Sequence, residues 1–191
     1  MVATHEPSEP DRDWVRAAAG GDRAAFERLY RCYETRVFRY VSMLVRDRAL
    51  AEELVCETML AVWRAASSFA QGSRVSTWIF GIARHKAIDA LRRAGRQRQE
   101  VSLEEAAELP DPGESAADRL TRGEDALQLR AALARLSSEH QEVLRLVFHE
   151  ELPYDEIARL LAIPMNTVKT RVFYAKQQLK RHLEQAGGRL A

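Results

Sequence analysis

Cysteine and long apolar runs are both scarce in this sequence. Only Cys32 and Cys56 occur among 191 residues, so a disulfide framework is excluded and a reducing compartment, the cytoplasm, is expected. No window approaches the roughly 18 consecutive apolar residues of a membrane-spanning helix, so we expect no membrane insertion. The first 13 residues carry acids and prolines but no apolar stretch, which argues against a secretion signal. The 46% of apolar and 30% of charged residues are typical of a globular protein.

Net charge is also almost absent, because 29 basic residues are offset by 28 acidic ones. The total hides a segregation of charge along the chain. Residues 80–98 hold 6 basic and 1 acidic residue, residues 99–125 hold 2 and 9, and residues 164–191 again hold 6 and 1. Two cationic blocks therefore flank an anionic one, and a near-neutral total does not exclude a nucleic-acid partner.

Apolar residues recur at helical spacing in both halves of the chain, and no strand-like alternation of useful length is found. From residue 22 to about 93 we expect three helices. Arg46, Asp47 and Arg48 form a polar break after the first helix, and Ser76 or Thr77 can cap the third. Helical periodicity resumes at Ala126 and continues to about Gln185, and Ser137 or Ser138 is suited to cap a helix within this stretch. The stretch from Arg96 to about Glu124 is acidic, holds two prolines and two glycines, and has few large apolar residues to bury.

These patterns predict an all-α fold of two small helical domains joined by a flexible acidic linker. The predicted parts are a mobile N-terminus (1–21), a first domain (22–95), the linker (96–125), a second domain (126–185) and a tail (186–191).

The end of the second domain has the pattern of a helix-turn-helix. A short helix (154–161) is followed by Ile163 and Pro164, and Asn166 is suited to cap a second, basic helix. In this motif the N-terminal part of the second helix reaches base edges and phosphates. The alternative is a helical hairpin with an ordinary solvated basic face.

In the first domain, the predicted third helix carries basic residues beside Trp78, a combination that suits single-stranded nucleic acid. The Gly/Ser loop before it, residues 70–75, is small enough to admit an unstacked base. A tryptophan of this kind is more often part of a core. The preceding helix carries Glu52, Glu53 and Glu57, which composition alone cannot distinguish from a solvated acidic stripe.

Both halves resemble the sigma-70 family of bacterial RNA polymerase sigma factors, specifically the small extracytoplasmic-function (ECF) group. The resemblance covers most of residues 22–184, in the family's order and spacing. The segments that carry it are Leu50–Met59, Ser76–Arg93, Leu133–Ser137, Tyr154–Leu161 and Ile163–Arg171.

The resemblance implies a promoter-specificity subunit that binds core RNA polymerase through its β′ clamp helices and β flap, binds promoter DNA, assists its melting and is controlled by an anti-sigma factor. It implies polymerase contacts by Glu52, Glu53, Leu54, Val55 and Glu57. For the −10 element it implies Gln71, Ser73, Arg74, Trp78, Arg84, His85, Lys86, Arg92 and Arg93, with the loop holding a flipped base. For the −35 element it implies Asn166, Thr167, Lys169, Thr170, Arg171, Tyr174 and Lys176. The acidic linker matches the segment that threads the RNA path of the polymerase.

The chain departs from the family's usual residues at Cys56, Met59, His85 and Pro153. Cys56 and Met59 replace Gln and an aromatic, and both can still pack against a clamp helix. His85 stands where Asn is common, so promoter preference can differ.

Two other classes of function remain to be compared. One is a stand-alone helix-turn-helix regulator whose first domain serves dimerisation or effector binding. The other is an enzyme, which the sequence disfavours, because His149-Glu150-Glu151 lacks the second His of a zinc-protease motif and no phosphate-binding Gly loop is present. We expect no catalytic residue, no metal and no cofactor. For Cys32 and Cys56, a structural or partner-packing role is favoured over redox sensing.

Overall fold

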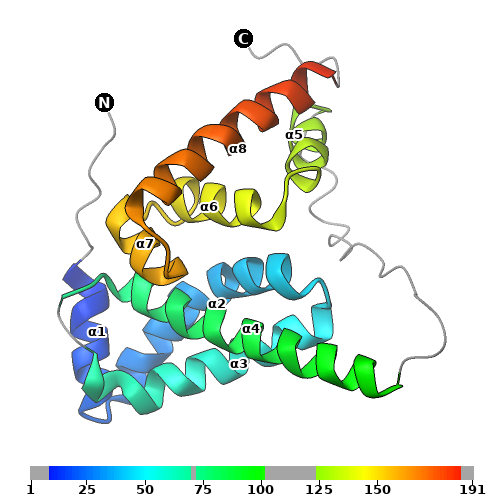
Figure 1. Cartoon of the computed structure of the whole chain (residues 1–191). Helices are drawn as coiled ribbons and strands as arrows, with labels where there is room; N and C mark the ends of the chain where they lie inside the picture. Colours follow the sequence, from blue (N-terminus) through cyan, green and yellow to red (C-terminus); the bar gives the residue numbers. More distant parts are fainter. Residues whose placement is uncertain (1–8, 70–71, 102–123, 186–191) are drawn as a thin grey trace. The chain divides into compact units, whose positions relative to one another are not determined.

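The computed structural model describes residues 9–69, 72–101 and 124–185, and every regular element in these ranges is a helix. The chain divides into two compact units, one built from α1 to α4 and the other from α5 to α8 (Figure 1). The predicted all-α, two-domain architecture is confirmed. Most of the predicted linker (102–123) and the predicted tail (186–191) lie outside the described residues. Within the described ranges, no helix combines the length and apolar character needed to cross a membrane.

The first unit is a bundle of four helices with one short 3-10 turn. Its elements are α1 (Glu9–Ala19), α2 (Arg23–Val45), α3 (Arg48–Ala65), η1 (Ala66–Ser68) and α4 (Val75–Val101). α2 packs against α1, α3 and α4, so it is the central helix of the bundle. The largest fully buried side chains include Leu29, Tyr33 and Tyr40 of α2 and Phe80 of α4. The Tyr40 and Phe80 rings meet edge to face, 5.3 Å apart.

The break between α2 and α3 was predicted from three polar residues, and the structure shows how it works. Arg46 adopts the left-handed conformation (φ 57°) and ends α2, while the Asp47 carboxylate accepts the amide of Leu50 at 3.1 Å and starts α3. Two adjacent residues therefore end one helix and begin the next.

Residues 1–21 were predicted to be mobile, and for residues 9–21 that prediction is wrong. α1 ends in a Schellman motif: the amide of Asp22 donates to the Ala17 carbonyl at 3.1 Å and that of Gly21 to the Ala18 carbonyl at 2.9 Å. Gly21 has φ +91°, which suits glycine alone. The Asp22 carboxylate then accepts the amides of Ala24 and Ala25 at the start of α2. One three-residue junction thus closes α1 and opens α2.

α1 docks on the bundle through an apolar stripe and one polar contact. Val15 and Ala18 are 1% and 3% exposed. The Tyr33 hydroxyl donates to the Asp11 carboxylate at 2.7 Å. Burial, followed by this hydrogen bond, raises the pKa of Tyr33 above its ordinary value. α1 is therefore an integral part of the first unit.

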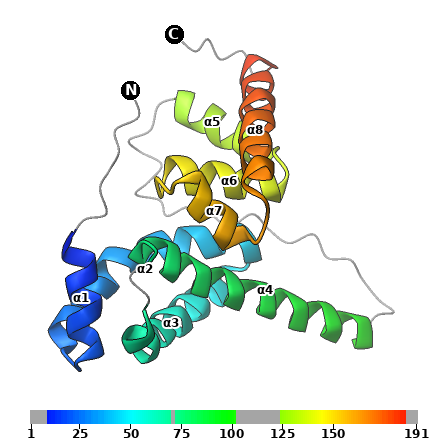
Figure 2. The ribbon, with the colours of Figure 1, turned by 60° about the vertical axis from the view of Figure 1, so that its left-hand side comes forward.

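α4 is longer at both ends than predicted. It begins at Val75, where the Trp78 amide donates to the Arg74 carbonyl at 3.1 Å, so Ser76 and Thr77 lie in its first turn and the prediction that either one caps it is wrong. It runs on to Val101, into the stretch predicted to be linker, and its last turns project beyond the other helices of the unit (Figures 1 and 2).

The second unit consists of α5 (Glu124–Ala134), α6 (Ser138–Phe148), α7 (Tyr154–Leu161) and α8 (Met165–Gln185). α8 packs against each of the other three helices, as both views show. Val143, Leu146, Ile157 and Val168 are completely buried in its core. Ser137 caps α6 as predicted, accepting the His140 amide at 3.3 Å.

The turn between α7 and α8 repeats the motif that ends α1, with a different residue at its strained position. The amide of Ile163 donates to the Ala158 carbonyl at 3.0 Å, and Ala162 takes the left-handed conformation at φ 54°. α8 then starts at Met165, with the amides of Thr167 and Val168 donating to the Pro164 carbonyl. Asn166 lies inside the helix, so the prediction that it caps α8 is wrong.

Candidate functional site

The residues predicted to contact polymerase lie on α3, but they do not all face outward. Glu52 and Glu53 are exposed and Glu57 is half-buried. Leu54 is 1% exposed because it packs into the bundle, so direct contact by Leu54 is ruled out in this structure. Met59, also predicted to pack on a clamp helix, is equally buried. These two side chains pack α3 into the bundle, whereas Glu52 and Glu53 lie on the surface.

Beside these carboxylates, a groove of about 320 Å³ runs between α2 and α3. Val55 and Cys56 line it from α3 and Tyr30 and Phe38 from α2, so Val55, although only 6% exposed, belongs to this surface. The pKa of the Tyr30 hydroxyl is raised, first by burial and then by the neighbouring Cys56 and Glu34. The hydroxyl therefore stays protonated. The charged residues of this apolar groove are Glu34, Glu52 and Arg48, and Arg48 pairs with Glu52 at 3.0 Å. A groove of this kind fits a helix with basic and apolar side chains that can compete with Arg48 for the carboxylates.

The residues predicted to bind the −10 element are spread along α4 and the loop that precedes it. Gln71 lies outside the described residues. Ser73, Arg74, Trp78 and Arg84 are half-buried, whereas His85, Arg92 and Arg93 are exposed. The Trp78 ring packs at 5.0 Å against the Phe69 ring, so Trp78 is neither a core residue nor an isolated surface ring. The two rings form a small aromatic face next to the loop.

Further along α4, basic side chains surround a hollow of about 420 Å³. Lys86, Arg92 and Arg93 line it together with Glu57 and Asp89. The Lys86 ammonium lies 3.0 Å from the Glu57 carboxylate, and the His85 ring pairs with Asp89 at 3.0 Å. Both acids lower the net positive charge of this face without removing it, because three cations oppose two carboxylates around the hollow.

The residues predicted to read the −35 element lie on the first three turns of α8. Asn166, Lys169, Thr170, Tyr174 and Lys176 are exposed and Thr167 is half-buried. Arg171 is 25% exposed and its guanidinium pairs with the Glu139 carboxylate of α6 at 3.0 Å. A phosphate or a guanine edge must therefore compete with Glu139 for Arg171. The Thr170 hydroxyl donates to the Asn166 carbonyl at 2.9 Å, which leaves its lone pairs as acceptors.

One residue on this face was missed by the sequence reasoning. Phe173 is 62% exposed, stacks edge to face on Tyr174 at 5.4 Å, and follows Asn166, Lys169 and Thr170 at helical spacing. Phe148 of α6 is 56% exposed and lies under the Lys176 ammonium at 4.9 Å. Large exposed aromatics at three- and four-residue spacing from the basic residues were the signal that could have identified Phe173.

Comparison with known proteins matches the two units separately. The family model described as "Sigma-70 region 2" matches residues 29–97, and the one described as "Sigma-70, region 4" matches residues 126–179.

Two relatives come from Mycobacterium tuberculosis. The chain is 33% identical over 174 residues to ECF RNA polymerase sigma factor SigK, covering 89% of this chain and 91% of the relative. It is 32% identical over 174 residues to ECF RNA polymerase sigma factor SigL, covering 91% of this chain and 97% of the relative.

Two solved structures are similar in fold. The sigma factor RpoE in complex with the anti-sigma factor NepR, from Bartonella quintana, has a TM-score of 0.63 at 25% identity, covering 83% of this chain and 96% of that one. CnrH in complex with the cytosolic domain of CnrY has a TM-score of 0.64 at 20% identity, covering 93% of this chain and 99% of that one.

The helical bundle and the helix-turn-helix unit define a two-domain transcription factor. The chain belongs to the sigma-70 family, among the ECF RNA polymerase sigma factors.

Proposed function

We propose that this chain is a dissociable promoter-specificity subunit of bacterial RNA polymerase with no catalysis of its own. The observation that carries the proposal is that each of the two units has a core helix whose basic side chains lie outside the core: α4 with Lys86, Arg92 and Arg93, and α8 with Lys169 and Lys176. In this proposal α4 and the preceding loop bind and help melt the −10 element. α8 enters the major groove at the −35 element, where the first residues of a recognition helix reach base edges.

Polymerase binding is assigned to the acidic residues of α3 and the groove beside them. Glu52 lines the groove between α2 and α3, and Glu53 is exposed on the same helix, so both can pair with basic residues of the β′ clamp helices. The second unit is expected to meet the β flap. Both assignments place the protein in the bacterial cytoplasm, where polymerase acts.

We also propose control by an anti-sigma factor. The support is that RpoE of Bartonella quintana was solved in complex with an anti-sigma factor. A partner that covers the carboxylates of α3 or the basic face of α8 would keep the chain from polymerase or from promoter DNA.

The test is run-off transcription with core RNA polymerase on a promoter selected from a random library by the reconstituted holoenzyme. Specific transcripts should require both core enzyme and this chain. Tight binding of the chain alone to a duplex operator, with no co-purification of core enzyme, would contradict the proposal and favour a stand-alone helix-turn-helix regulator.

A further inference from the structure

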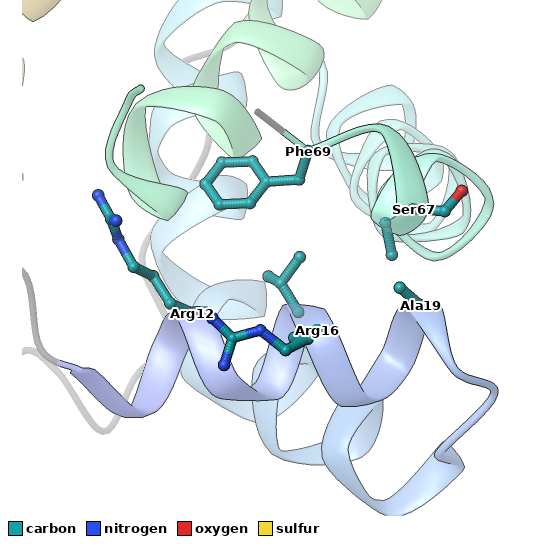
Figure 3. Close-up of a pocket in the computed structure, with 7 residues that line it drawn as sticks. Arg12, Arg16, Ala19, Ser67 and Phe69 are labelled. Carbon is teal, nitrogen blue, oxygen red and sulfur yellow. The ribbon is translucent and has the colours of Figure 1, made fainter. Parts of the chain in front are cut away.

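A cavity of about 200 Å³ lies between α1 and the segment that follows α3. It is lined by Arg12, Val15, Arg16, Ala19, Ala66, Ser67 and Phe69. Figure 3 shows Arg12 and Arg16 leaving α1 on the side of the Phe69 ring, with Ala19 and Ser67 at the other end. The region 2 model begins at residue 29, so one wall of this cavity comes from a helix that the family match does not include.

The cavity combines cationic and aromatic groups. Phe69 contacts Trp78 at 5.0 Å, so the cavity adjoins the aromatic face of the predicted −10 surface. Arg12 reaches the same loop, its Nη2 lying 3.4 Å from the Ser73 carbonyl oxygen. Aromatic rings beside cations are what proteins use to bind single-stranded nucleic acid, because bases stack on the rings while the cations meet phosphates.

The Arg12 guanidinium is poorly satisfied as it stands. Its contact with Ser73 is at the long limit of a hydrogen bond, and its Nε is buried with no hydrogen-bond partner among the described residues. A buried donor without an acceptor is costly, so such a group calls for an acceptor that enters the site. Arg16 pairs with Asp13 at 2.9 Å, but both side chains are 67% exposed, so this ion pair is weak and a phosphate can displace it.

The size of the cavity restricts what can enter it. At about 30 Å³ per water molecule, 200 Å³ holds about six or seven waters or one flat heterocyclic ring, and no folded peptide element. Val15, Ala19, Ala66 and Phe69 give it an apolar wall, and the two arginines give it an anion-binding rim. One nucleotide has both kinds of surface.

We propose that α1 extends the single-strand-binding surface: the cavity takes one unpaired nucleotide of promoter DNA, with Arg12 and Arg16 binding its phosphate and Phe69 contacting its base. This inference rests on the proposed function and adds α1 to it. The contact with the phosphate is independent of sequence, so it contributes affinity for melted DNA and no base preference of its own.

The experiment uses holoenzyme assembled from core polymerase and the full chain. Two fluorescent promoter probes are compared: a blunt duplex that ends at the upstream edge of the −10 element, and the same duplex with a single-stranded non-template extension. The affinity for each is measured over a range of salt concentrations. The double variant Arg12→Ala/Arg16→Ala should lose most of the affinity that the extension adds, and its salt slope should fall by about 0.7, the value for one phosphate contact on a single strand.

Three further proteins make the result interpretable. Arg31→Ala is the control for Arg16, because Arg31 is also exposed and paired with a carboxylate one turn away. Arg31 does not line the cavity, so this variant should bind both probes as wild type does. Arg12→Lys/Arg16→Lys keeps the charges and should keep the slope, which separates lost charge from lost folding. Ala19→Leu narrows the cavity from an exposed position and should weaken only the extended probe.

The inference is overturned if the extension raises the affinity of the Arg12→Ala/Arg16→Ala holoenzyme as much as that of wild type, with the same dependence on salt concentration. In that case a water molecule in the cavity, and not a phosphate, accepts the hydrogen bond of the buried Arg12 Nε. If wild-type holoenzyme binds neither probe, the proposed function fails first and the inference fails with it.

Discussion

The Lys86 ammonium of α4 lies 3.0 Å from the Glu57 carboxylate of α3. This ion pair joins a residue predicted to bind DNA to one predicted to bind polymerase. The two side chains are 29% and 39% exposed, so the pair contributes little to stability, on the order of 0–1 kcal/mol. Its interest is that any partner that engages Glu57 changes the charge that Lys86 presents to DNA.

Lys86→Ala is expected to weaken holoenzyme binding to a promoter probe with a single-stranded −10 extension by about three- to tenfold, because a phosphate contact is lost. The midpoint of chemical unfolding of the first unit should hardly change. Fluorescence anisotropy measures the first quantity and tryptophan fluorescence the second, since Trp14, Trp63 and Trp78 all lie in this unit. A large loss of stability with unchanged DNA affinity would make Lys86 a structural residue.

Glu53→Arg is expected to reduce the affinity for core polymerase by at least about tenfold, because placing like charges together at an interface costs several kcal/mol. Glu53 is exposed, so the domain should fold normally. Surface plasmon resonance with immobilised core enzyme gives the affinity. Glu27→Arg changes another exposed acid, on α2, and is the control that should bind as wild type does.

Phe173→Ala is expected to lower the affinity of holoenzyme for duplex −35 DNA by about tenfold, since an apolar contact to a base such as a thymine methyl group would be lost. At 62% exposure Phe173 contributes little to the core, so thermal stability should be unchanged. Leu129→Ala, at an exposed apolar position of α5, serves as control in the same gel-shift titration. Equal affinities for the two variants would remove Phe173 from the DNA-reading surface.

Ala162→Gly is expected to stabilise the second unit by about 0.5–1 kcal/mol, because an L-residue at φ 54° is strained and glycine is not. Hydrogen exchange of α7 and α8 in the full chain reports this unit alone, which matters since two units need not unfold together. Slower exchange is the expected result. Faster exchange would mean that the Ala162 side chain contributes more by packing than its backbone costs.

Gly21 occupies in the α1 motif the left-handed position that Ala162 occupies after α7, and Gly21→Ala introduces a side chain there instead of removing one. The change is expected to destabilise the first unit by about 1–2 kcal/mol. The reason is backbone strain at φ +91°, since the position has open space around it. Urea unfolding followed by tryptophan fluorescence measures it. Gly95→Ala, a glycine of α4 with equally open surroundings, should not destabilise.

The sequence predicted the helices that have a clear apolar face and a capping residue, such as α6 with Ser137, and the break at Arg46 and Asp47. It missed α1 because acids and prolines dominate the N-terminal composition. The spacing of Trp14, Val15 and Ala18 before Gly20-Gly21 was the available signal. At α8 the identity of Asn166 suggested a cap, but the turn through Ile163 and Pro164 starts the helix at Met165, two residues earlier than a cap at Asn166 implies.

The candidate site was harder to predict, because a motif specifies which residues occur together but not which way each one faces. Leu54 and Glu53 are neighbours in the same motif, yet one is 1% exposed and the other is on the surface. The pairing of Arg171 with Glu139 depends on how α6 packs against α8, and no local pattern contains it. Residue types were predictable, whereas their partners required the packed structure.

The junction at Gly20, Gly21 and Asp22 couples the fate of α1 to that of α2. Asp22 donates its amide to the last turn of one helix and accepts two amides from the first turn of the next, so neither end can fray without releasing the other. A helix near a chain end ordinarily opens readily, but here opening α1 also uncaps the central helix of the bundle. α1 should therefore exchange its amide hydrogens at rates close to those of α2, and the backbone positions of Arg12 and Arg16 are fixed relative to the bundle.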